Sequence, residues 1–514
     1  MTIETDIVII GSGLGGLCCG AMLAQYGYKV IVCESHNLAG GAAHGFEYQG
    51  FKFDSGPSLF SGMSYSPSTN PLRQVLDVIG EDIEWKTYNN WGCWLPEGYF
   101  DVAVGADAFY DLLIGLRGEE VGKQWRRLQE VMKPLGKASG AIPPGAFRYD
   151  LGAIFTLAPY ALSMLPYVFS ASKLSGSFGK VMDEVVTDEF IRNWLNLLCF
   201  MLSGLPADGT SAAEMAFMFA EWYRPGVVLD YPVGGSEAIV NALVRGMEKY
   251  GGQLWLSSHC EEILMENNRA RGIRLRSGKV IKVRKAVISN ASVWDTLSLI
   301  AEGDLPTDYR QSAQNTPMNN SFMHLHLGID GTGIAEDLPC HHMIVNDWSK
   351  GVTAEQNVMA VSIPSLLDPS LAPDGKHCIH VYTPATEPYS LWAGLKRNSS
   401  EYHNLKEMRS QVMWSALERF IPDIKERCEV TLVGTPLTHE RFLRRYRGTY
   451  GAAWNAGESL FPGSTTPVKD LYCCGDSTFP GIGVPAVAAS GMIVANTLAS
   501  VGQHLQVLSN LSSG

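Results

Sequence analysis

The sequence predicts an α/β fold in which a nucleotide-binding domain is interrupted by an inserted α+β domain. A run of β-forming residues, 6–10, ends at the glycine loop of residues 11–16, which leads into an apolar helix and a second strand. A β-meander pattern follows near residues 261–289, and a second glycine-rich strand and helix follow at 471–498. Because the pieces of one nucleotide-binding unit lie so far apart in the chain, the segments between them must form a second domain.

This organisation divides the chain into two discontinuous domains. We expect a Rossmann-type domain from residues 1–75, 228–299 and 431–505, and a substrate-binding domain from residues 76–227 and 300–430. The chain has 514 residues, of which 46% are hydrophobic, enough for about two or three domains. Trp, Met and Phe are frequent in the substrate-domain segments, where they form either ordinary core or the lining of a long apolar tunnel.

The loop GSGLGG, residues 11–16, carries the pattern G-x-G-x-x-G. Gly11 permits a tight turn, Gly13 lets the backbone approach a pyrophosphate at the helix N-terminus, and Gly16 lets the helix pack closely on the strand. Gly15 lies in the same loop. The loop therefore predicts a site for the pyrophosphate of a dinucleotide.

An acidic residue stands where such a site needs one. The second strand, residues 29–33, ends at Glu34, and Ser35 follows it. A carboxylate at the end of this strand accepts hydrogen bonds from a ribose diol. A tight glycine turn in an unrelated fold would not explain Glu34, so the sequence favours a dinucleotide.

Further glycine motifs distinguish FAD from a nicotinamide dinucleotide. Gly40 and Gly41 suit a long extended dinucleotide, and the backbone at Ile263, in the meander, is expected to contact the adenine. The segment LYCCGDSTFPGIGVPAVAASG supplies a distant strand, a carboxylate and a helix start, with the candidate residues Gly475, Asp476, Gly481, Gly483 and Val484. A nicotinamide-only dehydrogenase needs no such distant element, so we expect FAD.

A second strand-embedded G-x-G-x-x-G is not found, because GIDGTGIAED has Glu336 at the position of the third glycine. We therefore expect no NAD(P) domain within the chain. An external electron donor, or the substrate itself, would reduce the flavin.

Charge and cysteine content restrict the partners and the compartment. The net charge is −12, and the basic run RFLRRYR, residues 441–447, is expected to have a local anion-binding or structural role, so nucleic acid is not expected as a partner. The eleven cysteines form no C-x-x-C, which favours free thiols and a reducing compartment. The first residues show no signal or transit pattern, which predicts a cytoplasmic protein or the mature form of an imported one.

Residues 151–172 carry no formal charge, although Pro159 and Pro166 interrupt them. Two short helices fit this segment better than one transmembrane helix. We expect them to line a substrate cavity and touch a bilayer surface. The expected location is thus peripheral, on the cytoplasmic side of a bacterial plasma membrane or thylakoid, or in a plastid.

Several histidines are candidate metal ligands or catalytic groups. His324 and His326 would lie on one face of a strand, but no carboxylate or cysteine stands at a matching position nearby, and His341 and His342 add no better set, so no metal is expected. There is no G-x-S-x-G nucleophile motif. The remaining candidates for acid–base chemistry are weak ones, namely His44, His439 and Arg441.

Motifs spread over nearly the whole chain are shared with one group of flavoproteins. They are VIIGSGLGGL, GFKFDSGPSLFSG, YPVGG, VISNASVWDT, SIPSLLDPSLAPDGKHCIHVYT, VGTPLTHERFLRRYRGTYG and LYCCGDSTFPGIGVPAVAASG. On these motifs the chain resembles the FAD-dependent carotenoid isomerase-like and phytoene desaturase-like oxidoreductases, and most of all a subgroup found in cyanobacteria and plastids beside the prolycopene isomerases. The chain differs from those isomerases at two motifs. It has GGAAHGF where their motif is similar to GGSSGF, and GIGVPAVAASG where their motif is similar to GQGVIAVAFSG.

The resemblance implies the FAD-binding fold of the glutathione reductase and amine oxidase type. It also implies a reduced FAD that rearranges or oxidises double bonds of a C40 polyene taken from a membrane. We expect cis-to-trans isomerisation of a prolycopene-type carotenoid. A carotenoid desaturase, saturase or ketolase with net electron transfer stays open, as does an isoprenoid-binding carrier without turnover, although a carrier should have lost the cofactor glycines and Glu34.

Overall fold

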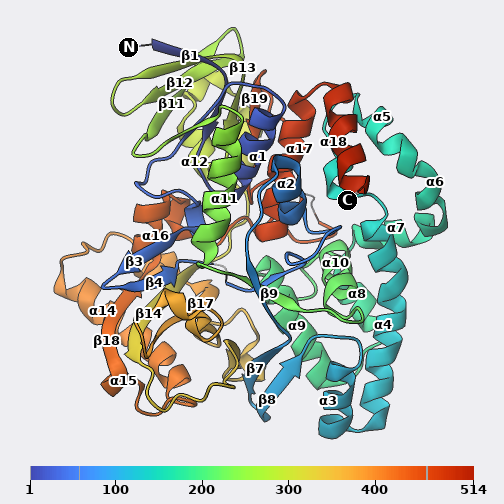
Figure 1. Ribbon diagram of the computed structural model, residues 1–514, viewed down its shortest axis with the longest axis vertical. Coiled ribbons are helices and arrows are strands. Elements are labelled where there is room, and N and C mark those ends of the chain that lie inside the picture. The colour runs from blue at the N-terminus through green and yellow to red at the C-terminus, as the bar shows by residue number, and fades with distance from the viewer. Residues whose placement is uncertain (1, 57, 459–460, 514) are drawn as a thin grey trace.

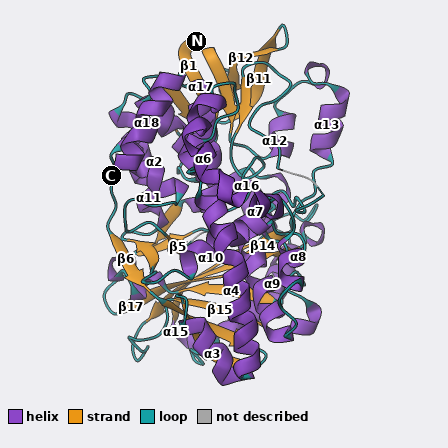
Figure 2. Ribbon diagram, turned by 90° about the vertical axis from the view of Figure 1, so that its right-hand side faces the viewer, coloured by secondary structure: helices purple, strands orange, loops and turns teal. Residues whose placement is uncertain are grey.

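The computed structural model describes residues 2–56, 58–458 and 461–513, and its two main sheets lie at opposite ends of the long axis (Figure 1). The upper part contains the N-terminus and the sheet built around β1 (Thr2–Ile10). The lower part contains a second sheet with the strands β14 and β17, and the α4 helix runs along its outer side (Figure 2). The chain passes repeatedly between the two parts, as expected for discontinuous domains.

The upper sheet combines parallel strands from three separate segments with an antiparallel meander. Its order is β10-β2-β1-β13-β12-β11, and β19 pairs with β13 beside this path. The pairs β1–β2, β1–β13, β2–β10 and β13–β19 are parallel. The remaining strands are β2 (Val30–Cys33), β10 (Gln253–Trp255), β11 (Cys260–Glu266), β12 (Arg269–Leu275), β13 (Val280–Ser289) and β19 (Leu471–Cys473).

Local sequence explains why these strands form. Ile7, Val8 and Ile9 of β1 are fully buried, as expected for a parallel strand that helices cover on both faces. Asn267 and Asn268 join β11 to β12 with φ values of 51° and 55°, the left-handed conformation that tight hairpin turns require. The predicted β-meander is confirmed.

The lower sheet has the order β18-β14-β17-β16-β15-β7-β8, and its neighbours are antiparallel except for β7 and β15. Its strands are β7 (Asn90–Leu95), β8 (Gly98–Ala103), β14 (Ser321–Asp330), β15 (His341–Val345), β16 (Val358–Ser362), β17 (Lys376–Glu387) and β18 (Cys428–Gly434). The hairpin β3 (Gly45–Tyr48) and β4 (Phe51–Asp54) and the small sheet β5 (Phe60–Ser61), β9 (Leu229–Pro232) and β6 (Trp85–Tyr88) complete the strands discussed below.

Helices cover both sheets. Around the upper sheet lie α1 (Leu14–Gln25), α2 (Pro71–Ile79), α11 (Ser236–Lys249), α12 (Val293–Ser298), α13 (Thr307–Gln314), α17 (Val484–Leu498) and α18 (Val501–Ser513). The others are α3 (Ala108–Arg117), α4 (Glu119–Gly140), α8 (Phe178–Asp183), α9 (Glu189–Ser203), α10 (Ala212–Trp222), α14 (Ser400–Leu417), α15 (Ile424–Arg427) and α16 (Pro436–Leu443). α1 and α17 pack so closely that a Cβ atom on Gly491 would lie 2.2 Å from the carbonyl oxygen of Gly15.

The uncharged segment 151–172 forms a series of short helices at the edge of the molecule (Figure 1). They are α5 (Ala153–Leu157), α6 (Ala161–Met164) and α7 (Val168–Leu174), separated by single 3₁₀ turns. In the part of the chain that the structure describes, no helix combines the length and the apolar character needed to cross a bilayer. Short helices in place of one span are confirmed, but the expected number of two is wrong, because 3₁₀ turns that include Pro159 and Pro166 divide the segment into three α-helices.

Candidate cofactor site

The candidate site lies where the carboxyl ends of parallel strands meet. The glycine loop follows β1, Glu34 follows β2, Asn290 follows β13, and Gly475 lies just beyond β19. β13 and β2 flank β1 on opposite sides, so the strand order reverses there, and in open α/β sheets this edge is where ligands bind. The structure thus brings together four segments that are far apart in the chain.

The first glycine loop has no room for larger side chains. Gly11 has a φ of 92°, which disfavours other residues. A Cβ atom on Gly16 would lie 2.3 Å from the carbonyl oxygen of Gly11, and one on Gly13 would lie 2.8 Å from Nδ2 of Asn290. Gly13 is the N-cap of α1, and because glycine has no side chain to cap the helix, the first N–H groups of α1 remain available to an anion.

The carboxylate of Glu34 is held by the same loop. Its Oε2 accepts hydrogen bonds from the N–H and the hydroxyl of Ser12, at 2.9 and 2.7 Å. Its Oε1 accepts hydrogen bonds from the hydroxyl of Ser35 at 3.2 Å and from the N–H of His36 at 2.8 Å. The acid is therefore fixed beside the glycine loop, as recognition of a ribose requires.

Gly40 and Gly41, called here the second glycine pair, contact the glycine loop of residues 11–16 directly. The N–H of Gly40 donates to the carbonyl oxygen of Ser12 at 3.0 Å. A Cβ atom on Gly41 would lie 2.9 Å from Cα of Gly13, so these two backbones approach each other closely. This contact lies at the N-terminus of α1, whose N-cap is Gly13.

The C-terminal motif reaches the same loop. A Cβ atom on Gly15 would lie 3.1 Å from Cα of Gly475, and the N–H of Gly475 donates to Oγ of Ser490 at 2.8 Å. Gly481 and Gly483 have φ values of 123° and 102°. Gly483 is the N-cap of α17, whose first residue is Val484, so a second helix N-terminus without a side-chain cap belongs to this motif.

Asn290 is a central residue of the site that the sequence interpretation did not single out. Cβ atoms built on Gly13, Gly15 and Gly475 would each lie within 3 Å of its side-chain amide. Its N–H donates to the carbonyl oxygen of Ile10 at 2.9 Å, which fixes it beside β1. Its position in VISNA, at the end of a predicted strand, was the available signal.

Asp476 is paired with Arg445, and Arg441 lies elsewhere. Nη2 of Arg445 forms an ion pair with Oδ2 of Asp476 and also donates to the carbonyl oxygen of Tyr450 at 2.6 Å. Arg441 is exposed, and its guanidinium lies 5.2 Å from the ring centroid of Phe442. Of these two arginines in the basic run, Arg445 is the one joined to the C-terminal motif.

Ile263 lies in a different environment from the other candidates. Its side chain is 1% exposed in the core beneath the meander, and its N–H donates to the carbonyl oxygen of Leu299 at 2.8 Å. The backbone of Glu34 is instead hydrogen-bonded to two other residues. The carbonyl oxygen of Trp255 accepts from the N–H of Glu34, and the N–H of Ser258 donates to the carbonyl oxygen of Glu34.

His44 lies directly after the second glycine pair. Its Nδ1 is 2.7 Å from the carbonyl oxygen of Gly41 and 3.0 Å from Oγ of Ser55. Burial lowers the pKa of His44, an effect that the hydrogen bond with Gly41 opposes. The ring is therefore held against the backbone of the loop.

Motifs from three parts of the chain meet at Asp54. Its carboxylate accepts hydrogen bonds from the hydroxyl of Tyr231 at 2.8 Å and from the N–H and hydroxyl of Ser236, both at 2.7 Å. The neighbouring Gly234 donates its N–H to Asp368 at 2.7 Å. One buried junction between the hairpin β3–β4 and the start of α11 is thus formed by the motifs FKFDSG, YPVGG and SLLDPS, which contain Asp54, Gly234 and Asp368.

His439 belongs to a cluster of buried histidines. Its Nε2 lies 2.5 Å from Nε2 of His324, whose Nδ1 lies 2.7 Å from Nε2 of His380. The ring of His380 is parallel to that of His326, with centroids 4.2 Å apart. Burial lowers the pKa of His439 to about 3 and that of His326 to about 4, so both rings are neutral at pH 7.

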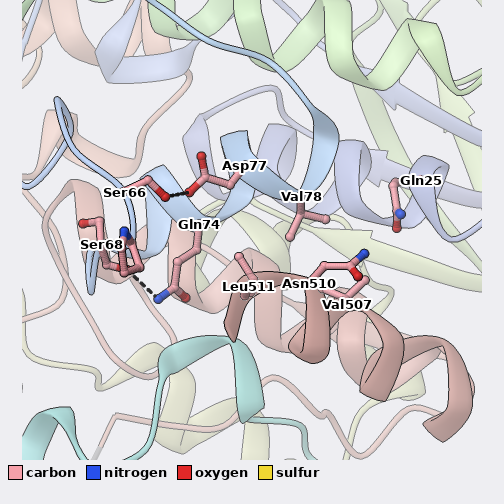
Figure 3. Close-up of a pocket in the computed structure, with 10 residues that line it drawn as sticks. Gln25, Ser66, Ser68, Gln74, Asp77, Val78, Val507, Asn510 and Leu511 are labelled. Carbon is pink, nitrogen blue, oxygen red and sulfur yellow. Dashed lines mark hydrogen bonds between the residues drawn. The ribbon is translucent and has the colours of Figure 1, made fainter. Parts of the chain in front are cut away.

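A separate cavity of about 120 Å³ lies among α1, α2 and α18 (Figure 3). The hydroxyl of Ser66 donates to Asp77 at 3.4 Å on its wall, and the amide of Gln74 donates to the carbonyl oxygen of Ser68 at 2.9 Å. Gln25, also on the wall, ends α1, about 18 Å along the helix from the glycine loop. This cavity is therefore distinct from the candidate site.

The residues present fit a flavin dinucleotide. Two helix N-termini without side-chain caps, α1 and α17, supply N–H groups that favour negative charge. Gly13 lies close to Gly41, and Gly15 lies close to Gly475, so backbone from three segments meets at the edge of the sheet, and Glu34 provides the carboxylate for a ribose.

Comparisons with known proteins agree with this geometry. The chain is 30% identical to a chloroplastic prolycopene isomerase of Daucus carota over 97% of this chain and 80% of that protein. It is 25% identical to a neurosporene-forming phytoene desaturase of Cereibacter sphaeroides over 95% of this chain and 93% of that protein. The structure is also similar to that of an oxidoreductase from Methanosarcina mazei, with a TM-score of 0.62 and 20% sequence identity. The match covers 96% of this chain and 99% of the other, which shows a shared fold.

The family model described as flavin containing amine oxidoreductase matches residues 14–499. The predicted fold class and the resemblance to carotenoid isomerase-like and desaturase-like flavoproteins are confirmed. The chain belongs to the flavin containing amine oxidoreductase family and is an FAD-dependent enzyme.

Proposed function

We propose that this protein is an FAD-dependent enzyme that isomerises cis double bonds of a prolycopene-type carotenoid to trans. The observation that carries the proposal is the similarity to the Daucus carota prolycopene isomerase over 97% of the chain. That match includes the segments outside the nucleotide-binding sheet, where a substrate would bind. Similarity confined to the glycine motifs would support only the cofactor.

The chemistry asks little of acid–base side chains. FAD in its reduced form, when bound, would lend electrons that lower the bond order of a polyene double bond and allow rotation, and would take them back afterwards, so that no net redox change occurs. The chain's own residues position the reactants and exclude water. We propose that the cofactor is held by the glycine loop of residues 11–16, by Glu34 and Ser35, by Gly40 and Gly41, and by the motif from Gly475 to Val484. Arg445 rather than Arg441 is proposed to orient Asp476.

We also propose that the enzyme takes its substrate from a membrane surface through the segment 151–172. This segment has no formal charge, and several of its large apolar side chains are exposed to solvent. The exposed fractions are 84% for Leu151, 68% for Ile154, 63% for Phe155, 79% for Leu162 and 64% for Leu165. Large exposed apolar side chains gathered in one uncharged segment are typical of peripheral membrane contact. We propose a location on the cytoplasmic face of a bacterial or thylakoid membrane, or in a plastid.

The deciding experiment incubates the FAD-reduced protein without oxygen with liposomes that carry poly-cis lycopene. Chromatography with mass detection then follows the carotenoid. A new isomer of unchanged mass, formed only when the flavin is reduced, supports isomerisation. A second incubation uses oxidised flavin and an added electron acceptor, and a product lighter by two hydrogens there would instead establish desaturation.

If lycopene remains unchanged under both conditions, the proposed substrate is wrong. Binding without turnover, measured by co-sedimentation of carotenoid with the protein, would then favour the isoprenoid carrier. An external electron donor is proposed for the cell, and any reductant that reduces the bound flavin can replace it in the assay.

A further inference from the structure

Three histidines gather on one face of the lower sheet. His324 and His326 stand two residues apart on β14, and side chains at this spacing point to the same face of a strand. The antiparallel register of β14 and β17 places His380 directly opposite His326. One nitrogen from each of the three rings lies within 4.8 Å of the others, and the residues are only 5%, 7% and 2% exposed.

The spacing suits ligands of one metal ion. Two imidazole nitrogens that are each about 2.1 Å from a tetrahedral Zn²⁺ lie about 3.4 Å apart. Among these three rings, Nδ1 of His324 and Nε2 of His380 lie 2.7 Å apart, and the candidate ligand atoms of all three lie within 4.8 Å of one another, so the separation required by a tetrahedral ion falls between these two values.

The surroundings supply the contacts that orient metal ligands. Nε2 of His326 lies 3.1 Å from the carbonyl oxygen of Asp54. When this nitrogen carries the proton and donates to Asp54, Nδ1 of His326 keeps its lone pair for a metal, and metal-binding histidines commonly have such a carbonyl partner. His439, from α16, approaches His324 from the other side at 2.5 Å.

Hydrogen bonds among the rings do not account for all the nitrogens of the cluster. Nδ1 of His380 is buried and has no hydrogen-bond partner within the described residues. A buried imidazole network that is only partly satisfied costs stability. The donor set, made of imidazoles without carboxylates, is one that Zn²⁺ and similar transition metals prefer and that Mg²⁺ and Ca²⁺ do not.

We propose that His324, His326 and His380 bind one divalent transition-metal ion, with Zn²⁺ as the best match. The ion would join β14 to β17, and through Asp54 it would fix the hairpin that follows the second glycine pair. The site is therefore a structural cross-link next to the cofactor site. It is independent of the substrate proposed above.

The test uses the FAD-loaded protein after chelator treatment, titrated with Co²⁺ as a spectroscopic probe. We expect the wild type to bind one Co²⁺ per chain, with new absorption at longer wavelength than the flavin bands, and Zn²⁺ to displace it. His380→Gln should bind Co²⁺ at least about tenfold more weakly, because a ligand is lost. His326→Gln should behave in the same way and serves as the second variant if His380→Gln does not fold.

His377→Gln is the matched control. His377 lies on β17 three residues before His380, and its Nδ1 lies 3.0 Å from Oγ of Ser365 instead of in the cluster. It should bind Co²⁺ like the wild type, and flavin absorbance should show that each variant keeps its fold. The proposal is overturned if the wild type takes up neither Co²⁺ nor Zn²⁺ in stoichiometric amount, or if His380→Gln and His326→Gln bind Co²⁺ as tightly as the control.

Discussion

Arg445 forms an ion pair with Asp476, which ties the turn after α16 to the loop after β19 at the cofactor site. The side chains of this pair are 19% and 16% exposed, so water screens the charges only partly. Arg445 also donates to the carbonyl oxygen of Tyr450, which fixes its guanidinium. Arg441, four residues earlier, points into solvent. The pair of arginines therefore offers a matched comparison.

Arg445→Met should weaken FAD binding by roughly tenfold to a hundredfold, because it leaves the partly buried Asp476 without its charged partner. Arg441→Met should leave the affinity unchanged. Titration of the apoprotein with FAD, followed by flavin fluorescence, measures both. Equal affinities for the two variants would show that the ion pair has no role in the site.

Gly13→Val should remove the yellow flavin absorbance from the purified protein. A Cβ atom at this position would lie 2.8 Å from Nδ2 of Asn290, and further carbons would fill the space at the start of α1. Gly115→Ala is the control, because no atom lies within 4 Å of its added Cβ atom in α3. It should retain FAD and gain roughly 0.5 to 1 kcal/mol of stability. Full FAD content in Gly13→Val would refute the pyrophosphate site.

Glu214→Gln should be more stable than the wild type, and its advantage in the free energy of unfolding should be larger at neutral pH than at pH 5. Burial raises the pKa of Glu214 from 4.5 to about 7, and its Oε2 has no hydrogen-bond partner among the described residues. Between these two pKa values the unfolded chain binds fewer protons than the folded one, so wild-type stability falls as pH rises, by roughly 1 to 3 kcal/mol in total.

Thermal unfolding of both proteins from pH 4 to pH 9 measures this effect. The difference in melting temperature should grow from about pH 5 to pH 7 and then stay constant, because Glu214 is ionised in both states above its folded pKa. A difference that does not change with pH would mean that Glu214 is not buried as an acid.

Replacing exposed apolar side chains of the segment 151–172 should release the protein from membranes. The double variant Leu162→Ser and Leu165→Ser removes two side chains that are 79% and 64% exposed, and each lost side chain weakens insertion by roughly 1 to 2 kcal/mol. Met408→Ser, at a residue that is 63% exposed on α14, is the control. Sedimentation with liposomes should fall at least about tenfold for the double variant and stay unchanged for the control. Equal binding of all three proteins would place the membrane contact elsewhere.

Short-range sequence patterns were enough to predict the local units of the fold. The loop from Gly11 to Gly16, the acid Glu34 and the helix that begins after Gly483 all follow from short-range spacing, because a turn, a strand end or a helix start is fixed by its own few residues. The meander was predicted from its turn residues for the same reason.

Contacts between distant side chains depend on the three-dimensional arrangement of the strands and loops. Asn290 lies against the glycine loop because β13 returns beside β1, and His380 completes a histidine cluster because the register of β14 and β17 sets it opposite His326. The selection of Arg445 over Arg441 depends on how the chain turns after α16. Such contacts are set by strand order, cross-strand register and loop conformation, which join residues far apart in the chain and leave no periodic pattern in the sequence.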